Sequence, residues 1–215
     1  MGMFFHRAFI NNCGIQEKIT FLTFYTGVTL SLGCSVVLHT FQAHSKPVLS
    51  AVSKLDYIGI IFTTMGHAIP WTYYGFYWQF RAKFIYIFLI ITTCFYGIVI
   101  STKEWFYTPE YRFFRAFMFV LIGFTAFSPT FHFALLHHWD ILFLKAITWE
   151  LLMGVFYIGG ALIYSSLYPE KYFPGKCDLY CQSHQIFHVC VVLGGFCHYQ
   201  AISQLSNNCL TEKKS

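Results

Sequence analysis

The sequence predicts an all-α integral membrane protein, a helix bundle with six transmembrane helices. Its 215 residues are 56% hydrophobic and only 11% charged, whereas a soluble domain carries about 25% charged residues. Six windows contain no Asp, Glu, Lys or Arg, and they are residues 19–45, 57–80, 84–102, 116–139, 151–169 and 179–211. Each window can hold the approximately 20 apolar residues that cross a bilayer core as a helix.

The distribution of charge argues against a nucleic-acid-binding protein. The net charge of +5 is scattered and forms no basic block of the kind that binds nucleic acid. We expect three segments, a polar N-terminal lead (1–18), the transmembrane bundle (19–205) and a polar tail (206–215). The spans themselves are expected at about 19–41, 53–78, 83–101, 114–136, 145–167 and 183–205. Cys34, Cys94, Cys190 and Cys197 lie inside the expected spans, where they pack as small hydrophobic residues.

The first two spans carry polar residues near the loop expected between them, residues 42–54. Ser35 and His39 are four apart, so on a helix the hydroxyl lies on the face of the imidazole. Ser35 either hydrogen-bonds its own backbone or belongs to a site. Asp56 lies where the second span is expected to begin, and it either caps the helix or serves as a metal or proton partner.

The last span begins with the pair His184 and His188. Four residues separate them, which places both imidazoles on one helix face, one turn apart. Such a pair can bind one zinc ion through two nitrogens. The alternative is that each histidine hydrogen-bonds to a neighbouring helix.

Counting the crossings places five polar residues near one membrane face. Consecutive spans cross in opposite directions, so Ser35, His39, Asp56, His184 and His188 all lie within about two turns of the same face. Three imidazoles with an open fourth position form the ligand set of a catalytic zinc site. Ionisable groups inside membranes are costly and usually mark function, so this constellation favours a metal site.

The other polar residues expected in or near the spans have interpretations of their own. His67 and His198 are expected near mid-depth, where they either hydrogen-bond between helices or act as axial ligands of a haem. Cys177 and Cys181 precede the histidine pair with a spacing typical of a closed structural zinc site. Glu150 is expected to be an interfacial acid near the start of its helix, favoured by the helix dipole.

Six motifs occur in order along the chain: Ser35-x-x-x-His39, Ser53-Lys54-Leu55-Asp56-Tyr57, Pro70-Trp71, Pro129-Thr130-x-His132-Phe133, Phe173-Pro174-Gly175-Lys176 and Ser183-His184-Gln185-Ile186-Phe187-His188. Together they resemble the progestin and adipoQ receptor family, specifically its adiponectin receptor branch, over roughly residues 16–205. The resemblance implies seven spans, so the six here correspond to helices two to seven. The expectation is a truncated gene model, a short isoform or a fragment that lacks the family's N-terminal region and first helix.

The resemblance also implies a site and its cofactor. By this likeness His39, His184 and His188 bind Zn²⁺ near the cytoplasmic face, Asp56 reaches the ion through water, and Ser35 lies beside it. The family's receptors bind adiponectin, promote lipid metabolic signalling and show ceramidase activity, while fungal relatives affect zinc and sterol balance. Lys and Arg are divided seven to seven between the two faces, so the positive-inside rule does not orient the chain.

Two classes of function follow. In the first, a buried zinc site hydrolyses a lipid amide such as ceramide, with Asp56 as general base and Ser35 orienting water or the carbonyl. In the second, a receptor with structural zinc, or a protein of lipid and zinc homeostasis, has no hydrolytic activity. Expected partners are a lipid substrate or fatty acid product and an adiponectin-like protein. The plasma membrane is the expected location, with an endomembrane as the alternative.

Overall fold

The computed structural model describes residues 14–136, 141–177 and 180–212. Within these residues every regular element is an α-helix or a short 3-10 helix, which confirms the all-α prediction. Six of the described helices are long and apolar enough to cross a membrane, so the chain is an integral membrane protein. The chain divides into two compact units, residues 1–133 and 134–215.

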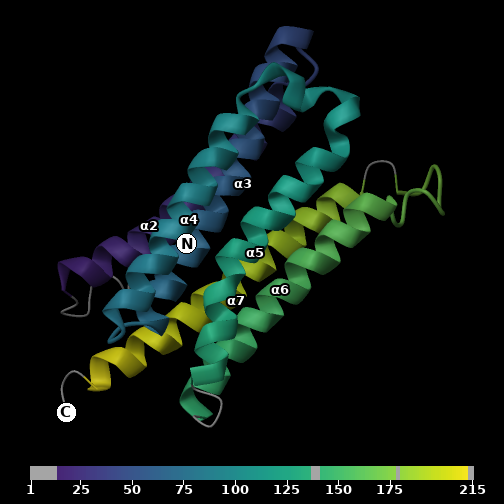
Figure 1. Ribbon diagram of the computed structural model, residues 1–215. Helices are drawn as coiled ribbons and strands as arrows, with labels where there is room; N and C mark the ends of the chain where they lie inside the picture. The colour runs from purple at the N-terminus through teal and green to yellow at the C-terminus, as the bar shows by residue number, and fades with distance from the viewer. Residues whose placement is uncertain (1–13, 137–140, 178–179, 213–215) are drawn as a thin grey trace. The chain divides into compact units, whose positions relative to one another are not determined.

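The first unit contains four long helices, which Figure 1 labels α2 to α5. They are α2 (Ile15–Phe41), α3 (Lys46–Gly75), α4 (Phe80–Ser101) and α5 (Arg112–Leu136), the last ending just beyond the unit, with two 3-10 helices, η1 (Glu104–Tyr107) and η2 (Pro109–Tyr111), between α4 and α5. A core of Ile61, Ala68, Ile90, Cys94, Phe106, Met118 and Ile122 joins α3, α4, η1 and α5.

The loop predicted over residues 42–54 is wrong for most of its length, because α3 already begins at Lys46. The Ser45 hydroxyl accepts a hydrogen bond from the backbone N–H of Val48, at 3.5 Å, and Pro47 lies in the first turn. A Ser cap followed by Pro is a helix start signal. Asp56 is therefore the eleventh residue of α3 and does not cap it, so the capping interpretation of this carboxylate is also wrong.

α2 and α3 pack through glycines at backbone distance. A Cβ added at Gly27 would lie 2.5 Å from the carbonyl oxygen of Phe62 and 2.9 Å from the Cα of Gly66. Only residues without side chains allow two helices to approach so closely. The rings of Phe24 and His67 pack edge to face beside this crossing, so α2 and α3 form one antiparallel pair.

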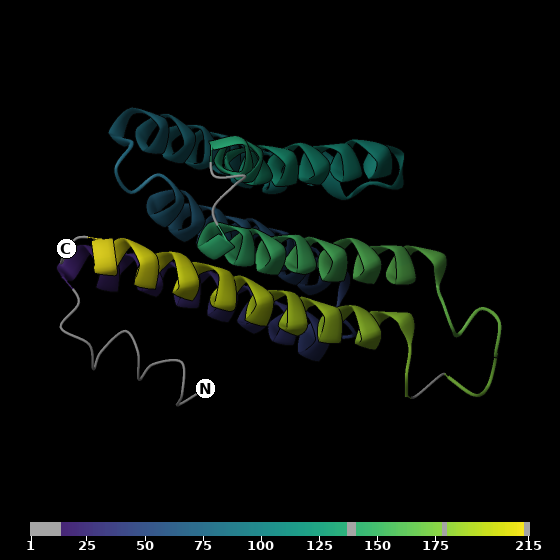
Figure 2. The same ribbon diagram turned by 90° about the horizontal axis from the view of Figure 1, so that it is seen from below.

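The second unit is the antiparallel pair α6 (Ile141–Ser166) and α7 (Ser183–Glu212), which run side by side in Figures 1 and 2. Small residues again set the contact, because a Cβ at Gly160 would meet the Cβ of Cys190 at 2.8 Å, and one at Gly194 would meet the ring of Tyr157. α7 continues beyond residue 205 to Glu212 and so includes the first residues of the segment predicted as a polar tail.

A buried carboxylate–imidazole contact joins α6 to α7. Glu150 is only 4% exposed and His198 is fully buried, and Nδ1 of His198 lies 2.8 Å from Oε2 of Glu150. This confirms the prediction that His198 bonds between helices. The prediction that Glu150 is an interfacial acid is wrong, because it is the tenth residue of α6 and lies inside the pair.

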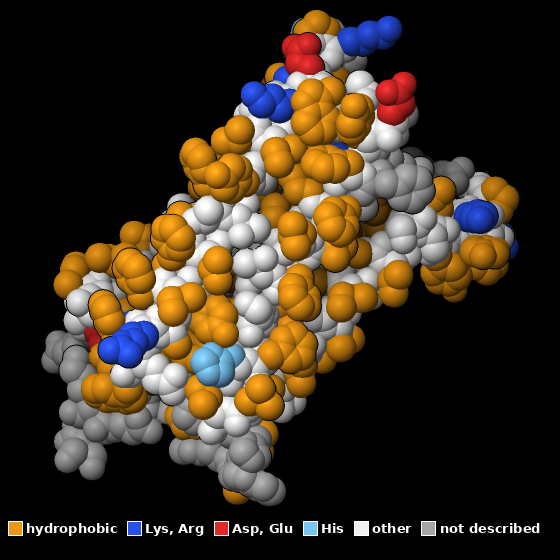
Figure 3. Space-filling model, in the orientation of Figure 1, with side chains coloured by type: hydrophobic (Ala, Val, Ile, Leu, Met, Phe, Trp, Pro, Cys, Tyr) orange, Lys and Arg blue, Asp and Glu red, His pale blue; other side chains and the backbone are white. Residues whose placement is uncertain are grey.

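Apolar side chains are spread along the helices on the face shown in Figure 3, where charged groups are few. On α4, Phe84, Phe88 and Phe95 are each exposed by 60% or more, and their spacing puts them on one helix face. A soluble monomer rarely exposes a large continuous apolar area. This surface matches helices that face lipid.

The Gly27 contact predicts a position-dependent cost of adding one methyl group to α2. Gly27→Ala should lower the melting temperature in detergent, because overpacking of this kind costs about 1–3 kcal/mol. Gly33→Ala on the same helix is the matched control, since no atom lies within 4 Å of its added Cβ. Equal melting temperatures for the two variants would contradict the packing argument.

The Glu150–His198 contact predicts strongly non-additive substitutions. His198→Leu leaves a buried carboxylate and should cost about 3–5 kcal/mol, and Glu150→Leu should cost less because an imidazole can stay neutral. The double variant should be more stable than His198→Leu, because no buried acid remains. Thermal unfolding of all four proteins in one detergent measures this, and additive losses would show that the two groups do not interact.

Candidate functional site

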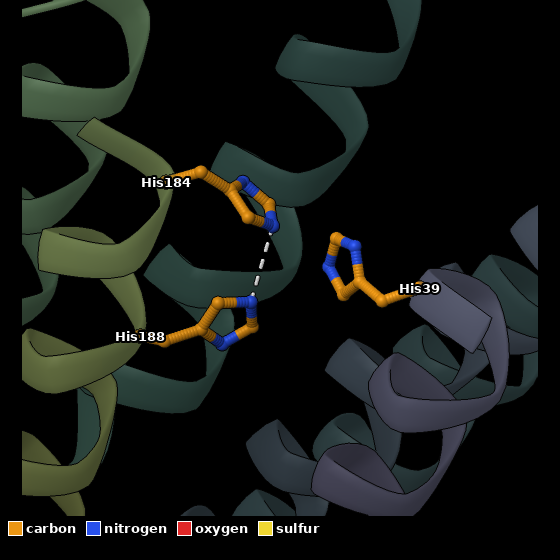
Figure 4. A group of neighbouring side chains, drawn as sticks. All are labelled: His39, His184 and His188. Carbon is orange, nitrogen blue, oxygen red and sulfur yellow. Dashed lines mark hydrogen bonds between the residues drawn. The ribbon is translucent and has the colours of Figure 1, made fainter. Parts of the chain in front are cut away.

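His184 and His188 meet at the start of α7, where they are the second and sixth residues of the helix. Their Nε2 atoms lie 3.1 Å apart and their ring centroids 4.7 Å apart. Figure 4 shows both rings projecting from successive turns and the contact between their nitrogens. Both side chains are half-buried, so the prediction that this spacing brings the two imidazoles together is confirmed.

The nitrogen separation suits a shared cation. Two nitrogens bound to a tetrahedral zinc ion at about 2.0–2.1 Å lie about 3.3–3.4 Å from each other. The observed 3.1 Å requires only a small opening of the pair. A direct hydrogen bond between the rings needs a proton on one Nε2, whereas a metal accepts both lone pairs. The donor set therefore fits zinc.

α6 supports this pair from one side. The ring of Tyr164 lies 5.2 Å from that of His184 and 5.7 Å from that of Phe187, centroid to centroid. We did not predict from the sequence that Tyr164 packs against His184, because residue spacing within α7 carries no information about α6. The antiparallel order of the two helices could have indicated it, since the last turns of one helix face the first turns of the next.

The first unit carries the other three predicted site residues, Ser35, His39 and Asp56. Ser35 and His39 lie one turn apart in the last two turns of α2. His39, also labelled in Figure 4, is exposed, and Ser35 is half-buried. The prediction that the hydroxyl and the imidazole share a helix face agrees with the helical run through residue 41.

Asp56 lies level with Ser35 in the α2–α3 pair. One turn beyond Asp56, a Cβ at Gly59 would lie 3.1 Å from both the Cα of Ser31 and the Cβ of Cys34. Because the helices are antiparallel, the turn that contains Asp56 faces the turn after Ser31. The first unit thus brings Ser35 and Asp56 to one end of one helix pair.

The contacts of the described residues do not support the two alternative metal sites, a zinc site with Cys177 and Cys181 and a haem held by His67 and His198. Cys177 and Cys181 are free thiols, and among the described residues neither belongs to a cluster of three or more ligand atoms suited to a metal. Nδ1 of His67 donates a hydrogen bond to the Thr63 carbonyl of its own helix, at 2.6 Å. Its described hydrogen bond is therefore within α3, and its contact with α2 is aromatic. His198 is engaged by Glu150.

Comparisons with known proteins show the family of this chain. The model of the family described as haemolysin-III related matches residues 2–199. The chain is 40% identical over 204 residues to "Progestin and adipoQ receptor-like protein 1" of Caenorhabditis elegans, covering 94% of this chain and 47% of that protein. It is 40% identical over 192 residues to "Adiponectin receptor protein" of Drosophila melanogaster, covering 89% and 43%.

A fungal protein is also similar to most of this chain. The chain is 34% identical over 183 residues to an ADIPOR-like receptor of Saccharomyces cerevisiae, covering 83% of this chain and 57% of that protein. The chain spans about half the length of the curated relatives it matches.

Proposed function

We infer a function from the premise that this chain belongs to the haemolysin-III related family and is an adiponectin receptor-like membrane protein of the progestin and adipoQ receptor family. We propose that it binds one zinc ion and hydrolyses a lipid amide. The observation that carries this proposal is the convergence of the His184 and His188 Nε2 atoms on one point. Because the two imidazoles are already held close together, less conformational entropy is lost when they bind a metal ion.

In this proposal His184 and His188 supply two ligands and His39 the third, leaving a position open for water or substrate. The assignment of His39 rests on its match to the family motif and on its position at the end of α2. When bound, zinc supplies a Lewis acid that polarises a carbonyl and makes water nucleophilic near neutral pH.

Asp56 is proposed as the general base. Its carboxylate takes a proton from water as the water oxygen bonds to the amide carbon, and it returns that proton to the leaving amine when the C–N bond breaks. Water is consumed and a fatty acid and an amine are released, so atoms and charges balance. Ser35, level with Asp56, donates a hydrogen bond that orients water or the carbonyl oxygen.

The proposed lipid partners are a lipid amide substrate, with ceramide as the leading candidate, and its fatty acid product. The apolar surfaces of the helices suit an acyl chain. The plasma membrane is the proposed location. An adiponectin-like protein is a proposed ligand because a similar protein of Drosophila melanogaster carries that receptor name.

The receptor names of the relatives also favour a second candidate. In it, zinc has a structural role and holds α2 and α7 together while a ligand is sensed, and no bond is broken. A protein of lipid and zinc homeostasis belongs to the same non-catalytic class. Release of fatty acid from a lipid amide by purified protein distinguishes catalysis from both.

The metal proposal predicts about one zinc per chain, measured by elemental analysis of purified protein. His184→Ala and His188→Ala should each remove most of it, because two ligands bind far more weakly than three. His44→Ala is the matched control, since His44 is an exposed imidazole in the connection after α2. Full zinc content in a triple variant of His39, His184 and His188 would overturn the site.

The proposed base predicts that Asp56→Asn separates binding from turnover. Asparagine keeps the shape and hydrogen bonding but cannot take a proton, so zinc content should be nearly unchanged. Turnover of a lipid amide should fall by about 10²–10⁴-fold, the usual contribution of general acid–base catalysis.

Measuring zinc and product release on the same samples decides between the roles. Loss of zinc from Asp56→Asn would make Asp56 a direct ligand, and undiminished hydrolysis would exclude it as the base. Wild-type protein that holds zinc but releases no fatty acid from any lipid amide would favour the receptor with structural zinc.

A further inference from the structure

The first turn of α7 begins without a standard capping side chain. Gln182 precedes the first helical residue, where Ser, Thr, Asp or Asn is usually preferred. The first backbone N–H groups of a helix have no carbonyl partner within it. One of these groups is served locally, because Oε1 of Gln185 accepts from the backbone N–H of Gln182 at 3.3 Å.

A carboxylate from the preceding loop supplies the missing acceptor. Oε2 of Glu170 accepts the backbone N–H of Ser183 at 2.7 Å, and Oε1 of Glu170 accepts the Ser183 hydroxyl. Ser183 is buried, with 1% of its surface exposed. Both carboxylate oxygens of Glu170 therefore accept hydrogen bonds from Ser183, the residue next to His184 and thirteen residues away from Glu170 in the sequence.

The loop itself is built to hold Glu170 in place. The backbone N–H of Lys171 donates to the carbonyl of Leu167 at 2.9 Å, and that of Tyr172 donates to the carbonyl of Pro169 at 2.9 Å. Leu167 adopts a left-handed conformation, with φ of 53°, which few non-glycine residues adopt without support. These turns tie the Glu170 backbone to the end of α6.

Charge adds to this geometry. The hydrogen bonds from the Ser183 hydroxyl and backbone N–H favour the ionised carboxylate, and they hold the pKa of Glu170 below its usual value. A negative group at a helix N-terminus also interacts favourably with the helix dipole. The carboxylate is thus charged at neutral pH and faces the positive end of α7.

We propose that Glu170 is a positioning residue that holds the first turn of α7 in the register in which His184 and His188 share one metal ion. The inference rests on the proposed zinc site. His184 lies in the first turn and His188 in the second, so fraying of the first turn moves one imidazole and leaves the other. Metal sites tolerate only about 0.5 Å of such displacement.

Two supports converge on His184. Tyr164 packs against its ring from α6, and Glu170 holds its backbone neighbour from the loop. Without Glu170 the aromatic contact alone does not fix the conformation of the first turn of α7, because ring packing is broad in angle. The hydrogen bonds from Ser183 to both carboxylate oxygens specify where the helix starts.

The test uses the full chain in one detergent, with Zn²⁺ alone as the probe and a chromophoric chelator as competitor. Glu170→Ala should weaken zinc binding about 10–100-fold, the usual effect of losing a group that orients a metal ligand. Glu170→Gln keeps the length and one acceptor and should lose less. Glu104→Ala is the matched control, since Glu104 is an exposed loop acid at the start of η1.

A second readout separates positioning from general stability. Co²⁺ bound in place of zinc should show an altered visible spectrum in Glu170→Ala, whereas a variant weakened only in folding keeps the wild-type spectrum. Ser183→Ala should lose part of the affinity, and the double variant should lose less than the sum of the two single losses.

The outcomes distinguish this proposal from the one on which it rests. Wild-type protein that binds no zinc overturns both. Zinc-binding wild type with unchanged affinity and spectrum in Glu170→Ala overturns only the positioning role. If Glu170→Ala does not fold, Glu170→Gln and Ser183→Ala carry the same comparison, and wild-type affinity in both would reject the proposal.

Discussion

A polar group inside a bilayer has no water to bond with, so every one must find its partner in the protein. Five threonine hydroxyls solve this locally: Thr20, Thr64, Thr92, Thr125 and Thr148 each donate to a carbonyl four residues earlier in the same helix. Glu150 and His198 instead find their partner on a second helix, so this contact helps to decide how α6 and α7 pair.

The α6–α7 pair shows how one contact sets others. Glu150 and His198 meet inside it, Tyr157 packs over Gly194 and Gly160 meets Cys190. Each step moves along α6 toward its C-terminus and along α7 toward its N-terminus. The same register brings Tyr164 to His184. The buried carboxylate–imidazole contact in the helix interior and the candidate metal ligands near the end of the pair therefore depend on one alignment.

The α2–α3 pair applies the same logic to the proposed base. The glycine contacts that place Gly27 on Gly66 and Gly59 on Cys34 also set Asp56 level with Ser35. Asp56 lies well inside a long helix and not at its end, so its carboxylate needs a reason other than capping. Ionisable groups inside membranes are costly and usually mark function, which supports the proposal that Asp56 is the base.

The sequence alone determined what acts over a few residues. Charge-free windows predicted the six helices, because a span needs only a run of apolar residues, and the helical period predicted that His184 meets His188. Only tertiary structure decided that Glu150 pairs with His198, 48 residues away, and that Glu170 caps Ser183 across a loop. It also moved Asp56 into a helix interior, since the Ser45–Pro47 start signal was hidden within a polar stretch. Partners on different helices depend on the axial register of packing, which is set where small residues let two backbones touch, and no local pattern encodes that register.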